Sequence, residues 1–229
     1  MREAETKQNP TVQKLLKAYK NANLDSVNVT DSTDRTIRNG YLGFLKAIKG
    51  IDYSAADVTL FCLELVIRPN SFERNNLFKA GIFISALVNS SGDHEFLVGL
   101  PGEKPLNCLG YRNTKRINVN YDVGEYCGNQ MLAGEISVNG NAGESAGASM
   151  HGGRIHIMGN ASGSAGMDMK GGTIIIDGDC FDDTIGAWAQ GGVIEINGKF
   201  EAFTRSCKAR ILHNGTNITR TVRRNNKFD

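Results

Sequence analysis

Glycine recurs at a fixed interval through the second half of this 229-residue sequence, and this interval limits the folds that the chain can adopt. Eighteen of the 27 glycines lie between Gly124 and Gly198, a stretch without proline. A flexible linker would show no common phase among its glycines, so the interval indicates a repeating structural unit. Three series run through the stretch in step: Gly128, Gly147, Gly166 and Gly186; Gly134, Gly153, Gly172 and Gly192; Gly140, Gly159, Gly178 and Gly198.

Apolar residues repeat with the same phase as the glycines. The equivalent positions are Ile117, Ile136, Ile155, Ile174 and Ile194; Val119, Val138, Ile157, Ile176 and Ile196; and Met131, Met150 and Met169, with Ala189 in the fourth place. Within a unit the pattern alternates with period two, as in a short strand. A single 19-residue unit has too few apolar side chains to bury a core, whereas stacked units bury them together. The pattern therefore predicts a β-solenoid with coils about 4.8 Å apart, and glycines where the chain turns with positive φ or where coils pack closely.

The repeat sets the predicted domain boundaries. The segment that starts at Arg116 aligns with the one at Glu135, and Phe96 precedes Ile117 by nearly the same interval, which adds an earlier coil. We expect the β-helix to span residues 93–204. Residues 1–92 would form an N-terminal cap domain, and residues 205–229 a basic C-terminal cap or tail that covers the last strand edges.

The N-terminal region has a different pattern. Apolar residues recur at helical spacing in residues 12–19 and again in residues 35–49. Residues 57–69 contain β-branched and aromatic residues, which favours a strand. Residues 78–88 fit either a helix or a buried strand. The sequence thus predicts an α/β cap domain.

The C-terminal segment, residues 199–229, carries eight basic side chains against Glu201 and Asp229. A solvated or disordered terminus is one interpretation, and docking of an acidic protein partner is another. Nucleic acid is the least favoured partner, because no aromatic residues are interleaved and no nucleic-acid motif is present. The candidate docking residues are Arg205, Lys208, Arg210, Arg220, Arg223, Arg224 and Lys227.

Composition narrows the class of protein. With 40% hydrophobic and 22% charged residues the chain fits a soluble globular protein, and it lacks the apolar run of about 18 residues that a membrane span needs. The N-terminus has no signal-peptide core. The cysteines (Cys62, Cys108, Cys127, Cys180 and Cys207) are odd in number and lack a CxxC spacing, which favours reduced thiols in a cytoplasmic protein.

Few residues are candidates for chemistry. His151 and His156 flank one coil without a partner at metal-ligand spacing, so solvated histidines are expected. The carboxylates of Glu125, Glu144 and Asp182 would stack and either bind Ca²⁺ or splay into water, the second being favoured. The column Arg116, Glu135, Arg154 alternates in sign and would stabilise the stack. Cys127 and Cys180 share columns with small apolar residues, which indicates interior packing. No catalytic residue, cofactor or metal is predicted.

The repeated unit G-G-x-I-x-I-x-G, in register from Arg116 to Gly198, resembles the GxGxG repeat. That repeat is shared by the C-terminal domain of the glutamate synthase large subunit and by the C subunit of formylmethanofuran dehydrogenase. The resemblance implies a right-handed parallel β-helix and a non-catalytic role, as a spacer between catalytic domains or a partner that joins catalytic subunits. The first cysteine is Cys62 and no iron–sulfur cysteine cluster occurs, so the chain is not expected to be a glutamate synthase by itself.

Two functions follow as hypotheses. The first is a scaffold subunit that joins the catalytic subunits of an oxidoreductase-type complex. The second is a free-standing ligand-binding protein or enzyme with a site where the N-terminal domain meets the first coils. A homo-oligomer that closes the solenoid ends by symmetry is compatible with either.

Overall fold

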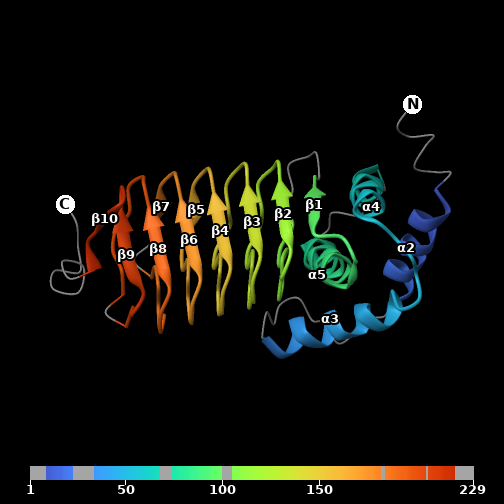
Figure 1. Cartoon of the computed structure of the whole chain (residues 1–229), viewed down its shortest axis with the longest axis horizontal. Helices are drawn as coiled ribbons and strands as arrows, with labels where there is room; N and C mark the ends of the chain where they lie inside the picture. Colours follow the sequence, from blue (N-terminus) through green and yellow to red (C-terminus); the bar gives the residue numbers. More distant parts are fainter. Residues whose placement is uncertain are drawn as a thin grey trace.

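The computed structural model describes residues 9–22, 34–67, 74–99, 105–181, 184–204 and 206–219, and it shows a helical cap followed by a parallel β-solenoid (Figure 1). The helices are α2 (Pro10–Asn21), α3 (Asp34–Ala47), α4 (Ala55–Ile67) and α5 (Arg74–Ser90). The strands are β1 (Glu95–Val98), β2 (Arg116–Val119), β3 (Glu135–Val138), β4 (Arg154–Ile157), β5 (Ala161–Ser162), β6 (Thr173–Ile176), β7 (Cys180–Phe181), β8 (Val193–Ile196), β9 (Arg210–His213) and β10 (Thr216–Asn217).

The predicted parallel solenoid is confirmed by the strand register. Strands β1, β2, β3, β4, β6, β8 and β9 lie side by side in chain order, each parallel to the next. Ile136 pairs with Ile117 on one side and with Ile155 on the other, so one repeat of the sequence is one coil of the solenoid. The aliphatic columns of the sequence are buried, as are Met131 and Met150. The solenoid interior is therefore a continuous stack of apolar side chains.

The coils turn through residues with positive φ, as the glycine pattern predicts. In one coil Gly147 has a φ of 69° and Gly153 a φ of 85°. Ser145 and Ser149 also have positive φ, at 60° and 53°. These two positions were not singled out in the sequence, because serine is not a marker of this conformation as glycine is.

Polar side chains fasten neighbouring coils along one edge of the solenoid. The Oδ1 atom of Asp122 accepts a hydrogen bond from the Asn141 backbone N–H at 2.7 Å, and Asn141 Oδ1 accepts from Asn160 N–H at 2.8 Å. The pattern continues from Asn160 to Asp179 and from Asp179 to Lys199, at 2.8 and 2.7 Å. Each side chain satisfies a backbone donor one coil further on, which fixes the spacing of the coils.

The solenoid extends beyond residue 204, where the sequence predicts its end. Strand β9 pairs in parallel with β8, and Ile211 continues the buried column one place after Ile194. The coil between them is shorter than the repeat, and this shortening hides it in the sequence. Strand β10 then folds back antiparallel on β9. The first part of the predicted basic tail is thus the last coil and its cap.

The described part of the N-terminal cap is helical, and the predicted strand over residues 57–69 is wrong. Helix α4 covers residues 57–67, the described part of this segment, and Val58, Phe61, Cys62 and Leu65 are buried at helical spacing. A capping box starts the helix: Asp57 Oδ2 accepts from Ser54 N–H at 2.9 Å, and Ser54 Oγ accepts from Asp57 N–H at 3.3 Å. This signal outweighs the β-branched composition. Residues 78–88, which fit two structures in the sequence, belong to helix α5.

An aromatic cluster forms the centre of the cap. The ring of Phe83 lies 4.9 Å from that of Phe44, 5.1 Å from that of Phe61 and 5.2 Å from that of Tyr19, between ring centroids. These residues come from four different helices, so the cluster ties the cap together. No described helix has both the length and the apolar character that crossing a bilayer requires.

The cap and the solenoid share one hydrophobic core, and helix α5 seals the first coil (Figure 1). The Ser85 hydroxyl on α5 donates to the Gly81 carbonyl at 2.7 Å and accepts from the backbone N–H groups of Gly110 and Tyr111, at 2.9 and 3.2 Å. A side chain at Gly81 would overlap the Asn107 carbonyl. The helix therefore lies directly on the solenoid backbone, and the two parts form one body.

Candidate functional site

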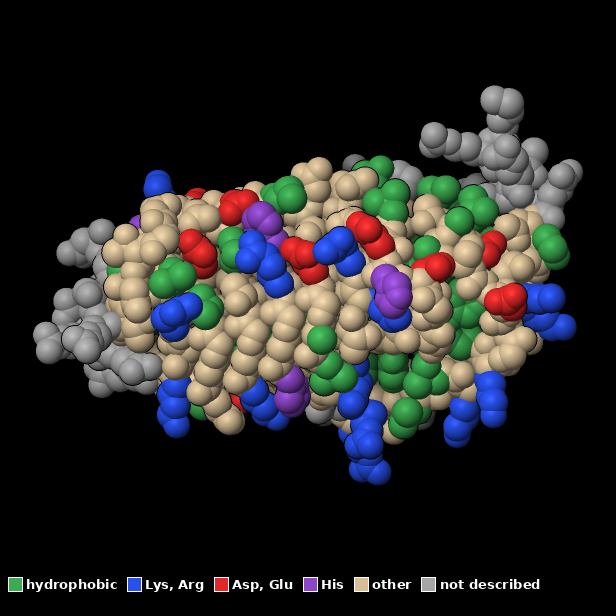
Figure 2. All heavy atoms as spheres, viewed as in Figure 1, with side chains coloured by type: hydrophobic (Ala, Val, Ile, Leu, Met, Phe, Trp, Pro, Cys, Tyr) green, Lys and Arg blue, Asp and Glu red, His purple; other side chains and the backbone are tan. Residues whose placement is uncertain are grey.

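An open hollow of about 490 Å³ lies where the first strands begin, next to the junction of cap and solenoid. It spans strands β1 to β4 and carries charged side chains of both signs, which alternate across this face in Figure 2. We call it the junction groove. It lies in the region where the sequence predicts an alternative ligand site. Its lining residues are His94, Glu95, Thr114, Lys115, Arg116, Gly134, Glu135 and Arg154.

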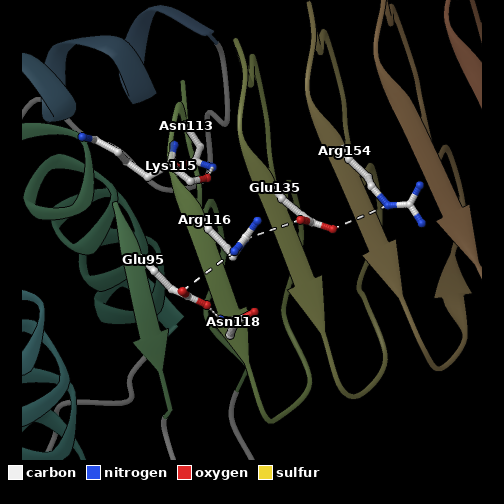
Figure 3. A network of polar contacts seen from close by, with 7 residues as sticks. All are labelled: Glu95, Asn113, Lys115, Arg116, Asn118, Glu135 and Arg154. Carbon is white, nitrogen blue, oxygen red and sulfur yellow. Dashed lines mark hydrogen bonds and ion pairs between the residues drawn. The ribbon is translucent and has the colours of Figure 1, made fainter. Parts of the chain in front are cut away.

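The predicted column of alternating charge forms one wall of the junction groove (Figure 3). Glu135 lies between two arginines, with its carboxylate 3.6 Å from Arg116 Nε and 3.6 Å from Arg154 Nε. Arg116 also reaches Glu95 on β1, at 3.9 Å, and Glu95 accepts a hydrogen bond from Asn118 at 2.8 Å. The prediction that these charges pair along the stack is confirmed.

These ion pairs are surface interactions. The Arg116 side chain is 56% exposed, and the distances exceed the 2.7–2.9 Å of a tight charge-assisted hydrogen bond. Pairs of this kind typically contribute about 0.2–1 kcal/mol each. In Figure 3 the terminal amino groups of Arg154 point away from Glu135. The end of the column therefore presents a guanidinium group to solvent.

Helix α5 and a buried asparagine position the other wall. The Asn113 side chain donates to the Lys115 carbonyl at 2.7 Å and accepts from the Lys115 N–H at 3.1 Å, which fixes the turn before β2. Asn89 on α5 accepts from Thr114 N–H at 3.3 Å and donates to the Tyr111 carbonyl at 3.1 Å. In Figure 3 the Lys115 side chain extends toward the cap, away from the ion-pair column. The cap thus determines the shape of the groove.

The junction groove can recognise charge, and its lining gives little support for covalent chemistry. The lining includes three permanent cations and two carboxylates, with Thr114 as its one hydroxyl. Threonine hydroxyls act as nucleophiles when an adjacent base activates them. Thr114 is held through its backbone N–H by the amide side chain of Asn89, and within the described residues its hydroxyl makes no hydrogen bond with His94, the histidine of the lining. Anionic or zwitterionic ligands are the class that such a lining favours.

The two histidines singled out in the sequence do not come together. His156 Nε2 lies 2.8 Å from Asp177 Oδ2, and Asn197 donates to the other oxygen of Asp177 at 3.0 Å. His151 Nε2 lies 3.4 Å from Lys170 Nζ. The histidine–aspartate contact was missed because it joins neighbouring coils at an offset different from the repeat interval. Within the described residues, no group of three or more His, Cys, Asp and Glu side chains could hold a metal ion.

The stacked carboxylates of the predicted column are described in part. The Tyr126 N–H donates to the Glu144 carbonyl at 2.8 Å, which places the coils of Glu125 and Glu144 next to each other. Asp182, the third member, lies outside the described residues, as does Asp183.

All five cysteines are buried and free of disulfide bonds. The prediction of interior packing for Cys127 and Cys180 is confirmed, since both are fully buried. Burial raises the pKa of the Cys62 and Cys127 thiols to about 12, and it raises that of Cys108 well above its ordinary value. A nucleophilic thiol needs the thiolate form, so these three groups are unreactive near neutral pH.

The predicted basic docking residues are described only at the start of the tail. Lys208 is exposed two residues before β9, and Arg210 is exposed at its first position. The others lie outside the described residues: Arg205, Arg220, Arg223, Arg224 and Lys227.

Neither the comparison with protein-family models nor the comparison with curated proteins returns a match for this chain. The resemblance to the GxGxG-repeat family therefore rests on the repeat pattern of the sequence. The structure agrees with that pattern in its fold, which many functions can share.

Proposed function

We propose that this protein is a non-catalytic assembly subunit that joins catalytic subunits of an oxidoreductase-type complex. The observation that carries the proposal is the use of charged and polar side chains to fasten coils to one another. Glu135 contacts Arg116 and Arg154, and the Asn and Asp side chains of four successive coils bond backbone N–H groups of the next coil. Such fastening yields a stiff rod, as expected of a spacer between larger bodies.

Two further observations support this function. The cap seals the solenoid through one continuous core, so surfaces at the two ends of the molecule are held at a fixed separation. The described cysteines are buried inside that core. The repeat of the formylmethanofuran dehydrogenase C subunit, which this sequence resembles, belongs to a protein with a joining role.

Purification from the native source tests the proposal. The protein would carry a tag at the C-terminus, and the material bound to it would be identified and quantified. We expect a catalytic subunit of an oxidoreductase at a fixed ratio to the tagged chain, stable to washing at physiological salt. A chain recovered alone, as a monomer or as a homo-oligomer, would contradict the assembly function.

The junction groove favours a second candidate, a ligand-binding protein. The exposed guanidinium group of Arg154 at the end of the ion-pair column is the feature that favours it. Titration with small carboxylates and inorganic phosphate, followed by calorimetry, tests this function. Binding that is lost in Arg154→Ala and kept in Met158→Ala, a substitution of an exposed residue outside the groove lining, would support it. Heats no larger than those of dilution would argue against it.

A further inference from the structure

The most exposed large hydrophobic side chain of the described residues is Trp188, at 62%. It is also the only tryptophan in the sequence. Trp188 lies in the turn before β8 with a φ of 55°. Its backbone N–H donates to Ser206 Oγ of the next coil at 3.0 Å. The backbone around the ring is therefore fixed, and the ring itself faces solvent.

Lysine residues occupy the coils before and after that of Trp188. The Gln190 N–H donates to the Met169 carbonyl at 2.7 Å, and the Lys208 N–H donates to the Ala189 carbonyl at 2.8 Å. These bonds place Lys170 and Lys208 on the coils before and after Trp188, so that their backbones are about 10 Å apart at two coil spacings.

Two more cationic or polar groups complete the surface. Arg210 is exposed at the first position of β9, and His151 lies 3.4 Å from Lys170. An aromatic centre surrounded by charged and polar residues is the arrangement in which tryptophan contributes most to protein–protein binding. We call this surface the Trp188 corner, and it comprises His151, Lys170, Trp188, Gln190, Lys208 and Arg210.

We propose that the Trp188 corner docks an acidic segment of a partner protein. Lys170 and Arg210 give the corner a positive charge, and among the described residues of the same turn column the carboxylate is that of Asp168, one coil before Trp188. This charge excess attracts acidic side chains, and the ring supplies an apolar anchor. Binding of single-stranded nucleic acid uses several aromatic rings on which successive bases stack, and Trp188 is the one Phe, Tyr or Trp among the residues of the corner, which disfavours nucleic acid. The inference rests on the proposed assembly function, for which it specifies the surface and the chemistry of the partner.

Poly-L-glutamate is the probe for a first test, with the full-length protein at low salt. Because Trp188 is the only tryptophan, its fluorescence reports directly on the corner. We expect a saturable change in its emission and a loss of binding as salt rises. Lys170→Glu is expected to weaken the binding of labelled polyglutamate about tenfold, as reversal of a charge at a complementary interface does. Trp188→Ala is expected to weaken it about fivefold.

Matched substitutions serve as controls. Lys199→Glu makes the same change of net charge at an exposed residue on another edge, and Phe181→Ala removes a ring that is 59% exposed on strand β7. Both are expected to bind within twofold of the unaltered protein. Thermal unfolding of all variants verifies that each is folded. Equal weakening by Lys199→Glu and Lys170→Glu would refute the assignment, as would an unchanged Trp188 emission. Tighter binding of oligothymidylate than of polyglutamate would also refute it.

The native complex separates this inference from the proposed function. If a partner co-purifies with the unaltered chain, we expect it to be absent from the purified Lys170→Glu variant and present with the Lys199→Glu variant. A partner retained by both variants would contradict the assignment of the Trp188 corner as the docking surface and would leave the assembly function intact. If the unaltered chain brings no partner, the assembly function fails, and the polyglutamate titration still decides whether the corner binds acidic chains.

Discussion

Close approach of neighbouring coils predicts a large effect of one small substitution, Gly143→Ala. A Cβ atom added at Gly143 would lie 2.7 Å from the Gly124 carbonyl carbon and 2.8 Å from the Glu125 nitrogen, both in the backbone of the preceding coil. These atoms cannot turn aside as a flexible side chain can. Two hydrogen bonds hold them in place: Gly143 N–H to the Val123 carbonyl at 2.9 Å, and Tyr126 N–H to the Glu144 carbonyl at 2.8 Å.

The size of the effect follows from these contacts. Ordinary contact begins near 3.4 Å, so the two coils must separate by more than half an ångström at this point. Overpacking of a well-packed interior costs about 1–3 kcal/mol. Weakening of the two hydrogen bonds adds about 0.5–1 kcal/mol. We expect Gly143→Ala to lower the free energy of unfolding by about 1.5–4 kcal/mol.

Gly43→Ala is the matched control. Gly43 lies in helix α3, and an added Cβ there meets nothing within 4 Å. Alanine in a helix is favoured over glycine by about 0.5–1 kcal/mol, so this variant should be slightly more stable than the unaltered protein. Urea unfolding followed by circular dichroism measures both. The reasoning would be refuted if Gly143→Ala unfolded at the same urea concentration as Gly43→Ala.

Three further predictions concern the core, the thiols and the ion pairs. Ile155→Ala removes a fully buried side chain and should lower the free energy of unfolding by about 2–5 kcal/mol, whereas Met158→Ala, at a residue 47% exposed, should change it by no more than about 0.5 kcal/mol in the same denaturation assay. The Cys62 and Cys127 thiols have pKa values raised from 9.0 to about 12, so the folded state disfavours their ionisation. Their contribution to stability should be constant below pH 9 and should fall between pH 9 and 12, by about 1.4 kcal/mol per pH unit for each thiol. A stability that rose over this range in pH-dependent urea unfolding would contradict their burial. Glu135→Gln removes two exposed ion pairs and should lower the free energy of unfolding by about 0.5–2 kcal/mol at low salt. The loss should be smaller in 1 M NaCl, because salt screens the charges. A loss that did not depend on salt would show that packing, not charge, is lost.

The solenoid could be predicted from the sequence because each coil needs the same buried aliphatic residues and the same glycine turns. Ile136 and Ile155 must lie in one column if the chain advances one coil in each repeat interval, and Gly147 must accommodate positive φ in its turn. The register, the buried columns and the Arg116–Glu135 contact all follow from that interval. The coil that ends at Ile211 was missed because it is shorter than the interval of the preceding coils.

The cap could be predicted only in part, since it contains no repeat. Helix α4 is apolar on several sides, because it packs against β1 as well as α2 and α5, and so the alternation that separates helix from strand is weak. The Ser54–Asp57 capping box was the signal that would have identified the helix. The junction groove depends on Asn89 of α5 meeting Thr114 of the first coils, and contacts between such distant segments leave no trace in one sequence.

Hydrogen exchange measured by mass spectrometry tests most directly the central claim that the cap and the solenoid form one stiff body. The shared core and the bonds of Ser85 to the Gly110 and Tyr111 backbone predict that peptides from α5, from β1 and from β2 to β8 have comparable protection and lose it together as urea is added. Exchange of the α5 peptides at a urea concentration where the peptides of β2 to β8 are still protected would contradict the claim. The molecule would then be a solenoid with an independent cap, and its two ends would not be held at a fixed separation.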